Sequence, residues 1–164
     1  AGGFLGSVLF LVVYAVHTEA VGWDVLIASL PSTLVIASVL TVNNTCDLDG
    51  DREAGRLTLA IVLGRRLSTV LVDTLVGAAY VLIVLMTLGG DRGLAAPESA
   101  IPGMPLPGLV AVAAGTVISA VILAGMHRRG YDRTTKHANM SAIIRVVVVF
   151  TAAYAAVLIL GAVL

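Results

Sequence analysis

Charged residues are scarce in this 164-residue sequence, at 12 % against roughly 25 % in an average soluble domain. So few polar groups cannot cover a globule in water, which excludes an ordinary soluble domain and a disordered tail. Ten basic residues balance ten acidic ones, so the excess of base that a nucleic-acid-binding protein needs is also missing. A single cysteine, Cys46, excludes an internal disulfide. The first apolar stretch has no basic flank or cleavage signal, so we expect no signal peptide.

Apolar residues, in contrast, are abundant, at 59 % of the sequence with a mean hydropathy of +1.02. A membrane-spanning helix needs about 20 mostly apolar residues. Five stretches are candidates: 1–18, 25–46, 67–90, 106–126 and 146–164. Only the third contains an acid, Asp73. Because backbone groups in lipid must be satisfied internally and no period-two alternation is present, we expect an all-α, polytopic transmembrane helix bundle of about five helices. Residues 1–164 are expected to form a single transmembrane domain.

The distribution of basic residues predicts the orientation of this bundle. Two groups of four lie between the second and third stretches and between the fourth and fifth: Arg52, Arg56, Arg65, Arg66 and Arg128, Arg129, Arg133, Lys136. The loop after the first stretch has no base, and the proline-rich loop 89–107 has only Arg92. By the positive-inside rule, the two basic loops are cytoplasmic and Trp23 lies at the outer interface.

One acidic segment, residues 43–60, directly follows a fully apolar stretch. If the helix continues through it, Asn43, Asp47 and Asp51 lie four residues apart on one face, and Asn44 borders that face. Carboxylates at this spacing repel each other unless a cation lies between them. An Asp at the centre of a membrane helix costs ~3 kcal/mol, so several acids at a membrane end imply water, a cation or both.

The donor set of this segment favours a magnesium site. Oxygen ligands without a His or Cys cluster suit Mg²⁺, which typically uses one or two carboxylates plus substrate phosphates. Arg52 and Arg56 follow at the same place, and guanidinium groups match phosphate oxygens. The alternative is a solvated acidic loop at the interface. A calcium loop is rejected, because Arg52 replaces the required glycine and Thr58 the bidentate glutamate.

The pattern Asn-Asn-x-x-Asp-x-x-x-Asp-x-x-x-Gly-Arg-x-Thr-Leu, within residues 43–64, resembles the second aspartate-rich motif of the UbiA superfamily of intramembrane prenyltransferases. It looks most like the menaquinone branch, the MenA-like 1,4-dihydroxy-2-naphthoate prenyltransferases. The resemblance implies a nine-helix bundle with a central cavity and two aspartate-rich motifs on facing helices. It also implies that Asp47 and Asp51 are catalytic and coordinate Mg²⁺. Four more residues would bind the substrate diphosphate: Asn43, Asn44, Arg52 and Arg56.

The first aspartate-rich motif of that superfamily has no counterpart in this sequence. Apart from the acidic segment, the cytoplasmic side offers only Asp73 and Asp132. We therefore expect the C-terminal part of a prenyltransferase, or a chain whose partner supplies the N-terminal half. Whether this chain is active alone is left open.

The function implied is Mg²⁺-dependent transfer of a polyprenyl group from polyprenyl diphosphate to an aromatic acceptor, 1,4-dihydroxy-2-naphthoate in menaquinone biosynthesis. Two alternatives stay open: another aromatic acceptor within the superfamily, and a non-catalytic membrane scaffold or cation-transport fragment. The expected partners are both substrates, the lipid bilayer and the N-terminal half, with no nucleic acid. The expected location is a bacterial cell membrane, with the active-site face cytoplasmic.

Other polar residues in or near the spans have less specific interpretations. Asp73 could hydrogen-bond a neighbouring helix or touch substrate. The loop 127–137, which contains Tyr131, could cap the cavity, bind anionic headgroups or only anchor the topology. Tyr80 and Tyr154 are expected to be packing residues. Cys46 is expected to point away from the acidic face.

Overall fold

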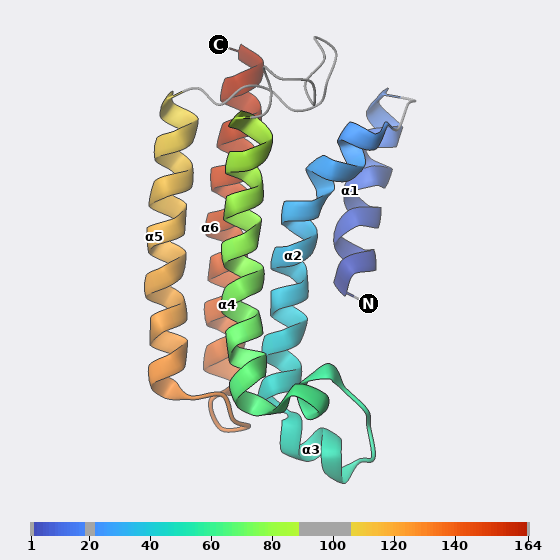
Figure 1. Ribbon diagram of the computed structural model, residues 1–164, viewed down its shortest axis with the longest axis vertical. Coiled ribbons are helices and arrows are strands. Elements are labelled where there is room, and N and C mark those ends of the chain that lie inside the picture. Colours follow the sequence, from blue (N-terminus) through green and yellow to red (C-terminus); the bar gives the residue numbers. More distant parts are fainter. Residues whose placement is uncertain (1, 19–21, 89–105, 164) are drawn as a thin grey trace.

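A computed structural model describes residues 2–18, 22–88 and 106–163, and all regular secondary structure in this part of the chain is helical (Figure 1). The proline-rich loop lies mostly outside the described residues. The helices are α1 (Gly2–Thr18), α2 (Trp23–Cys46), α3 (Leu48–Glu53), α4 (Leu59–Leu88), α5 (Leu106–Arg129) and α6 (Lys136–Val163).

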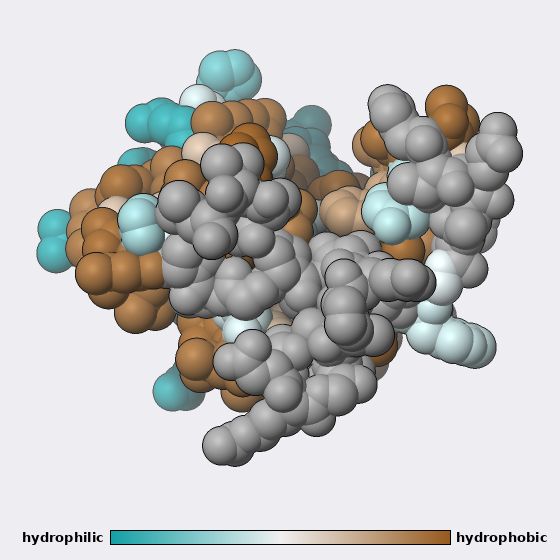
Figure 2. All heavy atoms as spheres, turned by 90° about the horizontal axis from the view of Figure 1, so that it is seen from above, coloured by the Kyte–Doolittle hydropathy of each residue, from teal (hydrophilic) through white to brown (hydrophobic). Residues whose placement is uncertain are grey.

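Four of these helices are long and apolar enough to cross a membrane, namely α2, α4, α5 and α6. Within the described side chains, α1 adds a further apolar segment, Gly6–Val16. Large apolar side chains are exposed along the helices, for example Leu85 (59 %), Val121 (68 %) and Val148 (62 %). Seen from above, apolar side chains form much of the visible outer surface (Figure 2). Such a surface requires lipid, which confirms a polytopic helical bundle.

Two helix boundaries differ from the expected spans. The last helix begins at Lys136, well before Val146, and α4 begins at Leu59. Gly64, with φ 75° and ψ 164°, interrupts α4 and separates its first turn from the long segment that follows. Hydropathy alone missed these extensions because their polar residues, such as Lys136, lie on helical turns outside the apolar core of each span.

The core is built from close helix pairs. α2 packs along α4 and also contacts α1 and α6, while α5 packs along α6. A Cβ at Gly115 of α5 would lie 3.0 Å from Tyr80 Oη and 3.1 Å from Ala153 Cβ, so this glycine allows three helices to meet. The Tyr80 and Phe150 rings pack edge to face with centroids 5.4 Å apart. In contrast, α4 and α5 touch each other only sparsely.

The two basic loops lie at the same end of the bundle. The end of α2, helix α3, the start of α4 and the turn between α5 and α6 all lie at the lower end of Figure 1. This confirms the alternation of basic and non-basic loops as one consistent topology. It also brings residues from α2, α3, α4 and α6 close together around the acidic segment.

Candidate functional site

The acidic segment forms the junction between α2 and α3. Asp47 (φ −91°, ψ 5°) separates the two helices, yet the helical hydrogen bonding continues across it. The Asp47 amide donates to the Asn43 carbonyl (3.1 Å), and the Asp51 amide donates to the Asp47 carbonyl (2.8 Å). Gly55 (φ 67°) ends this run, because glycine adopts the left-handed conformation without strain. The expected one-turn spacing of Asn43, Asp47 and Asp51 is therefore present in the backbone.

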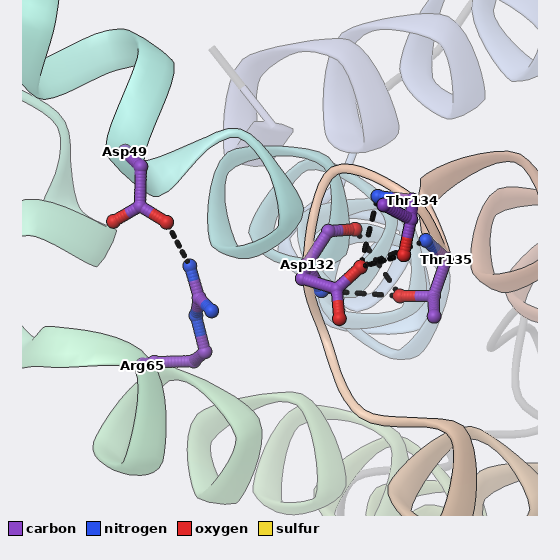
Figure 3. Close-up of polar contacts among 5 residues, drawn as sticks. All are labelled: Asp49, Arg65, Asp132, Thr134 and Thr135. Atoms are coloured by element: carbon purple, nitrogen blue, oxygen red, sulfur yellow. Dashed lines mark hydrogen bonds and ion pairs between the residues drawn. The ribbon is translucent and has the colours of Figure 1, made fainter.

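Each aspartate of the segment forms an ion pair with a cation from a different place in the chain. Asp47 pairs with Lys136, the first residue of α6. Asp49 Oδ2 pairs with Arg65 Nη2 of α4 at 2.8 Å (Figure 3).

Asp51 Oδ1 pairs with Arg56 Nη1 at 3.2 Å, and only 9 % of the Asp51 side chain is exposed. The more exposed Asp49 pair contributes little to stability, whereas losing the partner of the buried Asp51 would leave a desolvated charge. The charges of the three aspartates are thus balanced within the chain.

The remaining predicted diphosphate ligands surround these pairs. Asn43 and Asn44 lie half-buried in the last turn of α2. Arg52 is exposed in α3, and no ion pair of Arg52 is found among the described residues. The structure therefore leaves the Arg52 guanidinium accessible and engages the Arg56 guanidinium with Asp51.

The donor set fits a metal ion shared with a substrate better than a closed protein cage. Within the described residues, no group of three or more His, Cys, Asp or Glu side chains could hold a metal. Asp47 and Asp51, one turn apart, can supply two carboxylates, and Mg²⁺ usually completes its shell with water and substrate phosphates. A bound cation would compete with Lys136 and Arg56 for these carboxylates and so release two cationic groups.

Sequence reasoning missed two residues on α6 that organise this end of the bundle. Lys136 was assigned only to the basic loop, yet it reaches Asp47. Asn139 is completely buried, and its Nδ2 donates to the Gly130 carbonyl at 2.7 Å, while its Oδ1 accepts from Arg129. The spacing i, i+3 places Lys136 and Asn139 on one side of a helix, which was the available signal.

Three hydrogen bonds clarify the other polar residues in the spans. Asp73 Oδ2 of α4 contacts His127 Nε2 of α5 at 2.8 Å, so the interhelical interpretation of Asp73 is confirmed. Tyr154 Oη donates to the Ala28 carbonyl at 2.7 Å, and Tyr80 Oη is 3.0 Å from Ser119 Oγ. Both tyrosines are buried packing residues, as expected.

The turn between α5 and α6 contains two groups with shifted pKa values. Hydrogen bonds from the Thr134 hydroxyl and then from the Thr135 amide hold the pKa of Asp132 below its ordinary value (Figure 3). Burial, followed by the negative charge of Asp73, raises the pKa of Tyr131 above its ordinary value. Tyr131 therefore stays protonated, and Asp132 remains a strong acceptor at the start of α6.

These features define a class: a polytopic helical membrane protein with a compact group of carboxylates and guanidinium groups at one end. The profile of the UbiA prenyltransferase family matches residues 1–152. The chain belongs to that family.

Three relatives illustrate its range. UbiA prenyltransferase domain-containing protein 1 of Mus musculus is 35 % identical over 97 residues, which cover 59 % of this chain and 29 % of that protein. The Drosophila melanogaster homolog is 36 % identical over 83 residues, or 51 % and 23 % of the two chains. The 1,4-dihydroxy-2-naphthoate octaprenyltransferase of Bacillus subtilis (strain 168) is 27 % identical over 90 residues, or 55 % and 29 %.

The matched part of this chain thus spans less than a third of each of these relatives. No solved structure matches the chain.

Proposed function

We propose that this chain is the C-terminal part of a Mg²⁺-dependent enzyme that transfers a polyprenyl group from polyprenyl diphosphate to an aromatic acceptor. The observation that carries the proposal is the pair Asp47 and Asp51, one helical turn apart, with Arg56 on Asp51, at the polar end of an apolar bundle. Family membership supports prenyl transfer in general.

Each predicted residue has a defined role in this proposal. Asp47 and Asp51 hold Mg²⁺ together with the diphosphate, and the ion supplies positive charge that stabilises the departing diphosphate. Arg56 and the accessible Arg52 donate to phosphate oxygens, where guanidinium groups bind in a planar fork. Asn43 and Asn44 lie one turn before Asp47 and offer amide donors to the same group.

The remaining steps depend on the apolar surroundings. The isoprenoid tail is as apolar as the lipid-facing side chains of the bundle, so it can stay in the membrane while its head reaches the acids. As the diphosphate leaves, the allylic carbon gains positive charge and the electron-rich ring attacks it. The ring loses a proton, and the diphosphate departs with the bonding electrons.

For the acceptor we propose 1,4-dihydroxy-2-naphthoate, as in menaquinone biosynthesis. The paired asparagines and the Thr-Leu ending of the motif support it, as does the name of the Bacillus subtilis relative, a 1,4-dihydroxy-2-naphthoate octaprenyltransferase. We further propose a bacterial cell membrane as the location, with the acidic segment on the cytoplasmic face, because the basic loops share its end of the bundle.

We also propose that an N-terminal half supplies a second acidic cluster facing Asp47 and Asp51. The described residues contain no group of three or more metal-ligating side chains, and a diphosphate, which has two charged phosphate groups, would gain from carboxylate-bound cations on both sides. A cation pathway is disfavoured, because Asp73 is the only acid inside the described spans.

The test is prenyl transfer by the full assembly, containing both halves, in membranes with Mg²⁺. We expect Asp51→Asn to lower turnover by at least about a hundredfold. The variant would lose a ligand of the Mg²⁺ ion whose positive charge stabilises the departing diphosphate. Asp49→Asn is the matched control, since Asp49 belongs to the same segment but is exposed and paired with Arg65. Equal turnover in Asp51→Asn and wild-type membranes would contradict the proposal.

A further inference from the structure

A single lysine is present among the ten Lys and Arg residues of this chain, and it contacts a predicted metal ligand. Lys136, the first residue of α6, forms an ion pair with Asp47 at the end of α2, whereas all the other residues of this group are arginines. Lys136 and Asp47 are 89 positions apart in the sequence. This ion pair therefore joins α6 to the acidic segment.

The backbone at the start of α6 is fixed one helical turn after Lys136. Asn139 is completely buried, and its Nδ2 donates to the Gly130 carbonyl at 2.7 Å and lies 3.9 Å from the Cys46 sulfur. Cys46 is itself buried and directly precedes Asp47. Buried contacts thus hold α2 and α6 together independently of the ion pair, and the Lys136 side chain can move without moving its helix.

The Lys136–Asp47 ion pair is of a kind that another cation can open. The two side chains remain 35 % and 28 % exposed, so a metal ion in water can approach the carboxylate. Ion pairs with this much exposure to water are weak. An arginine can hold a carboxylate with two parallel hydrogen bonds, whereas the ammonium group of a lysine is a point charge on a flexible stem.

Once released from Asp47, the ammonium group would have a second acceptor close by. Neighbouring ligand oxygens in the octahedral shell of Mg²⁺ are about 3 Å apart. A diphosphate that shares a Mg²⁺ ion with Asp47 would therefore present an oxygen near the carboxylate that Lys136 contacts. Lysine binds phosphate groups well, so rotation of its side chain is enough to exchange one acceptor for the other.

We propose that Lys136 is an exchangeable cation of the diphosphate site. It neutralises Asp47 while the site is empty, and Mg²⁺ displaces it so that its ammonium group binds the diphosphate. The charge of the site is then balanced in both states. The identity of the diphosphate rests on the proposed function, whereas the exchange of Lys136 for Mg²⁺ on Asp47 does not.

The first test measures the chemical reactivity of Lys136 in the assembly that contains both halves, held in lipid nanodiscs. Sulfo-NHS acetate acetylates accessible amines, and peptide mass spectrometry identifies Lys136 as the one lysine of this chain. We expect millimolar Mg²⁺ to raise its acetylation rate about twofold to fivefold, as for the opening of a weak ion pair. Farnesyl diphosphate added with Mg²⁺, without an aromatic acceptor, should lower the rate again.

Two variants show whether this effect passes through Asp47. Asp47→Asn should abolish the response of Lys136 to Mg²⁺, whereas any general effect of Mg²⁺ on the reagent or the bilayer would persist. Asp49→Asn is the matched control, because Asp49 pairs with Arg65 instead, and it should respond like the wild type. A wild-type Lys136 rate that Mg²⁺ does not change would overturn the proposal, as would an unchanged response in Asp47→Asn.

The second test measures binding in Lys136→Met, which keeps an unbranched apolar side chain and removes the charge. We expect its affinity for Mg²⁺ alone to rise about threefold, because a weak competitor for Asp47 is lost. Its affinity for farnesyl diphosphate in the presence of Mg²⁺ should fall about tenfold, as for the loss of a hydrogen bond to a charged group. Lys136→Arg, which keeps a cationic donor, should restore most of the diphosphate affinity.

The matched control for charge is Arg65→Met, which removes a cation that pairs with Asp49 on the same segment. Charges in water are screened over about 10 Å, so this variant should change both affinities less than Lys136→Met does. Equal changes in Arg65→Met and Lys136→Met would overturn the proposal in favour of a general charge effect. A loss of both affinities in Lys136→Met would overturn it in favour of a structural role.

This inference and the proposed function fail in distinguishable ways. If the wild-type assembly with Mg²⁺ binds no farnesyl diphosphate, the proposed function fails, and acetylation with Mg²⁺ alone still decides whether Lys136 leaves Asp47. If the assembly binds farnesyl diphosphate with equal affinity in wild-type and Lys136→Met forms, the proposed function stands and the assignment of Lys136 is overturned.

Discussion

At the scale of single residues, the candidate site is governed by which cation neutralises which acid. Asp47 and Asp51 are close in sequence, but their partners Lys136 and Arg56 lie 89 and 5 residues away along the chain. These ion pairs offset the cost of partly removing the two carboxylates from water. In the proposed function a metal ion would replace these partners, so the same acids would serve folding in one state and binding in the other.

The Asp132 carboxylate leads to a prediction about pH. Its pKa is lowered because the charged form accepts hydrogen bonds from Thr134 and Thr135. A lowered pKa in the folded state means that the turn is stabilised above the ordinary carboxyl pKa of about 3.9, and that this stabilisation is lost as pH falls through the lowered value.

We expect the amide resonance of Thr134 to titrate with a midpoint below about 3.9 in NMR spectra of the protein in detergent micelles or nanodiscs. Asp132→Asn, which keeps the shape of the side chain, should abolish that titration. A midpoint at or above the ordinary value in the wild type would contradict the hydrogen-bonded turn.

At the scale of elements, some glycines adopt a backbone conformation that is strained for any other residue, and other glycines lie in ordinary helical conformation. Gly64 in α4 has φ 75°, a conformation that other residues adopt only with strain. It joins the short first turn of α4, next to the acidic segment, to the long apolar part of the helix. The direction of that first turn therefore depends on one residue that hydropathy does not distinguish from any other.

We expect Gly64→Ala to lower the free energy of unfolding by about 1–2 kcal/mol, because alanine is strained at positive φ. Gly77→Ala in the same helix should instead raise it by about 0.5–1 kcal/mol, since Gly77 is helical and a Cβ there meets nothing within 4 Å. Unfolding in mixed micelles with increasing denaturing detergent measures both. Changes of the same sign in the two variants would contradict the backbone assignment.

At the scale of the whole molecule, the bundle separates an apolar body from one strongly polar end. The basic loops and the acidic segment gather where α2 ends, α4 begins and α5 turns into α6 (Figure 1). An even number of membrane crossings between two loops returns the chain to the same side, so α4 and α5 together account for this arrangement. Substrates with a charged head and an apolar tail match such a division.

This arrangement predicts the labelling of single cysteines in intact cells. In a Cys46→Ser background, Glu53→Cys and Arg133→Cys should both resist a membrane-impermeant maleimide and react after permeabilisation. Trp23→Cys, at the other end of α2 and 81 % exposed, should react from outside. Opposite behaviour of Glu53→Cys and Arg133→Cys would contradict the shared end, and a complete reversal would contradict the proposed cytoplasmic face.

Much of the fold and the composition of the candidate site could be predicted because the physical signals are local. Hydropathy located four spans, and the i, i+4 spacing of Asn43, Asp47 and Asp51 required only that a helical turn continue past Cys46, as it does.

By itself the sequence thus determined a membrane-embedded helical bundle with its acidic segment and most of its basic residues at one end, because solvation and helical periodicity act over short stretches of chain. Only the tertiary structure decided that Lys136 pairs with Asp47, that His127 pairs with Asp73, and that a groove remains between α4 and α5. These contacts join residues far apart in the chain, and they depend on how the helices pack, which no local pattern specifies.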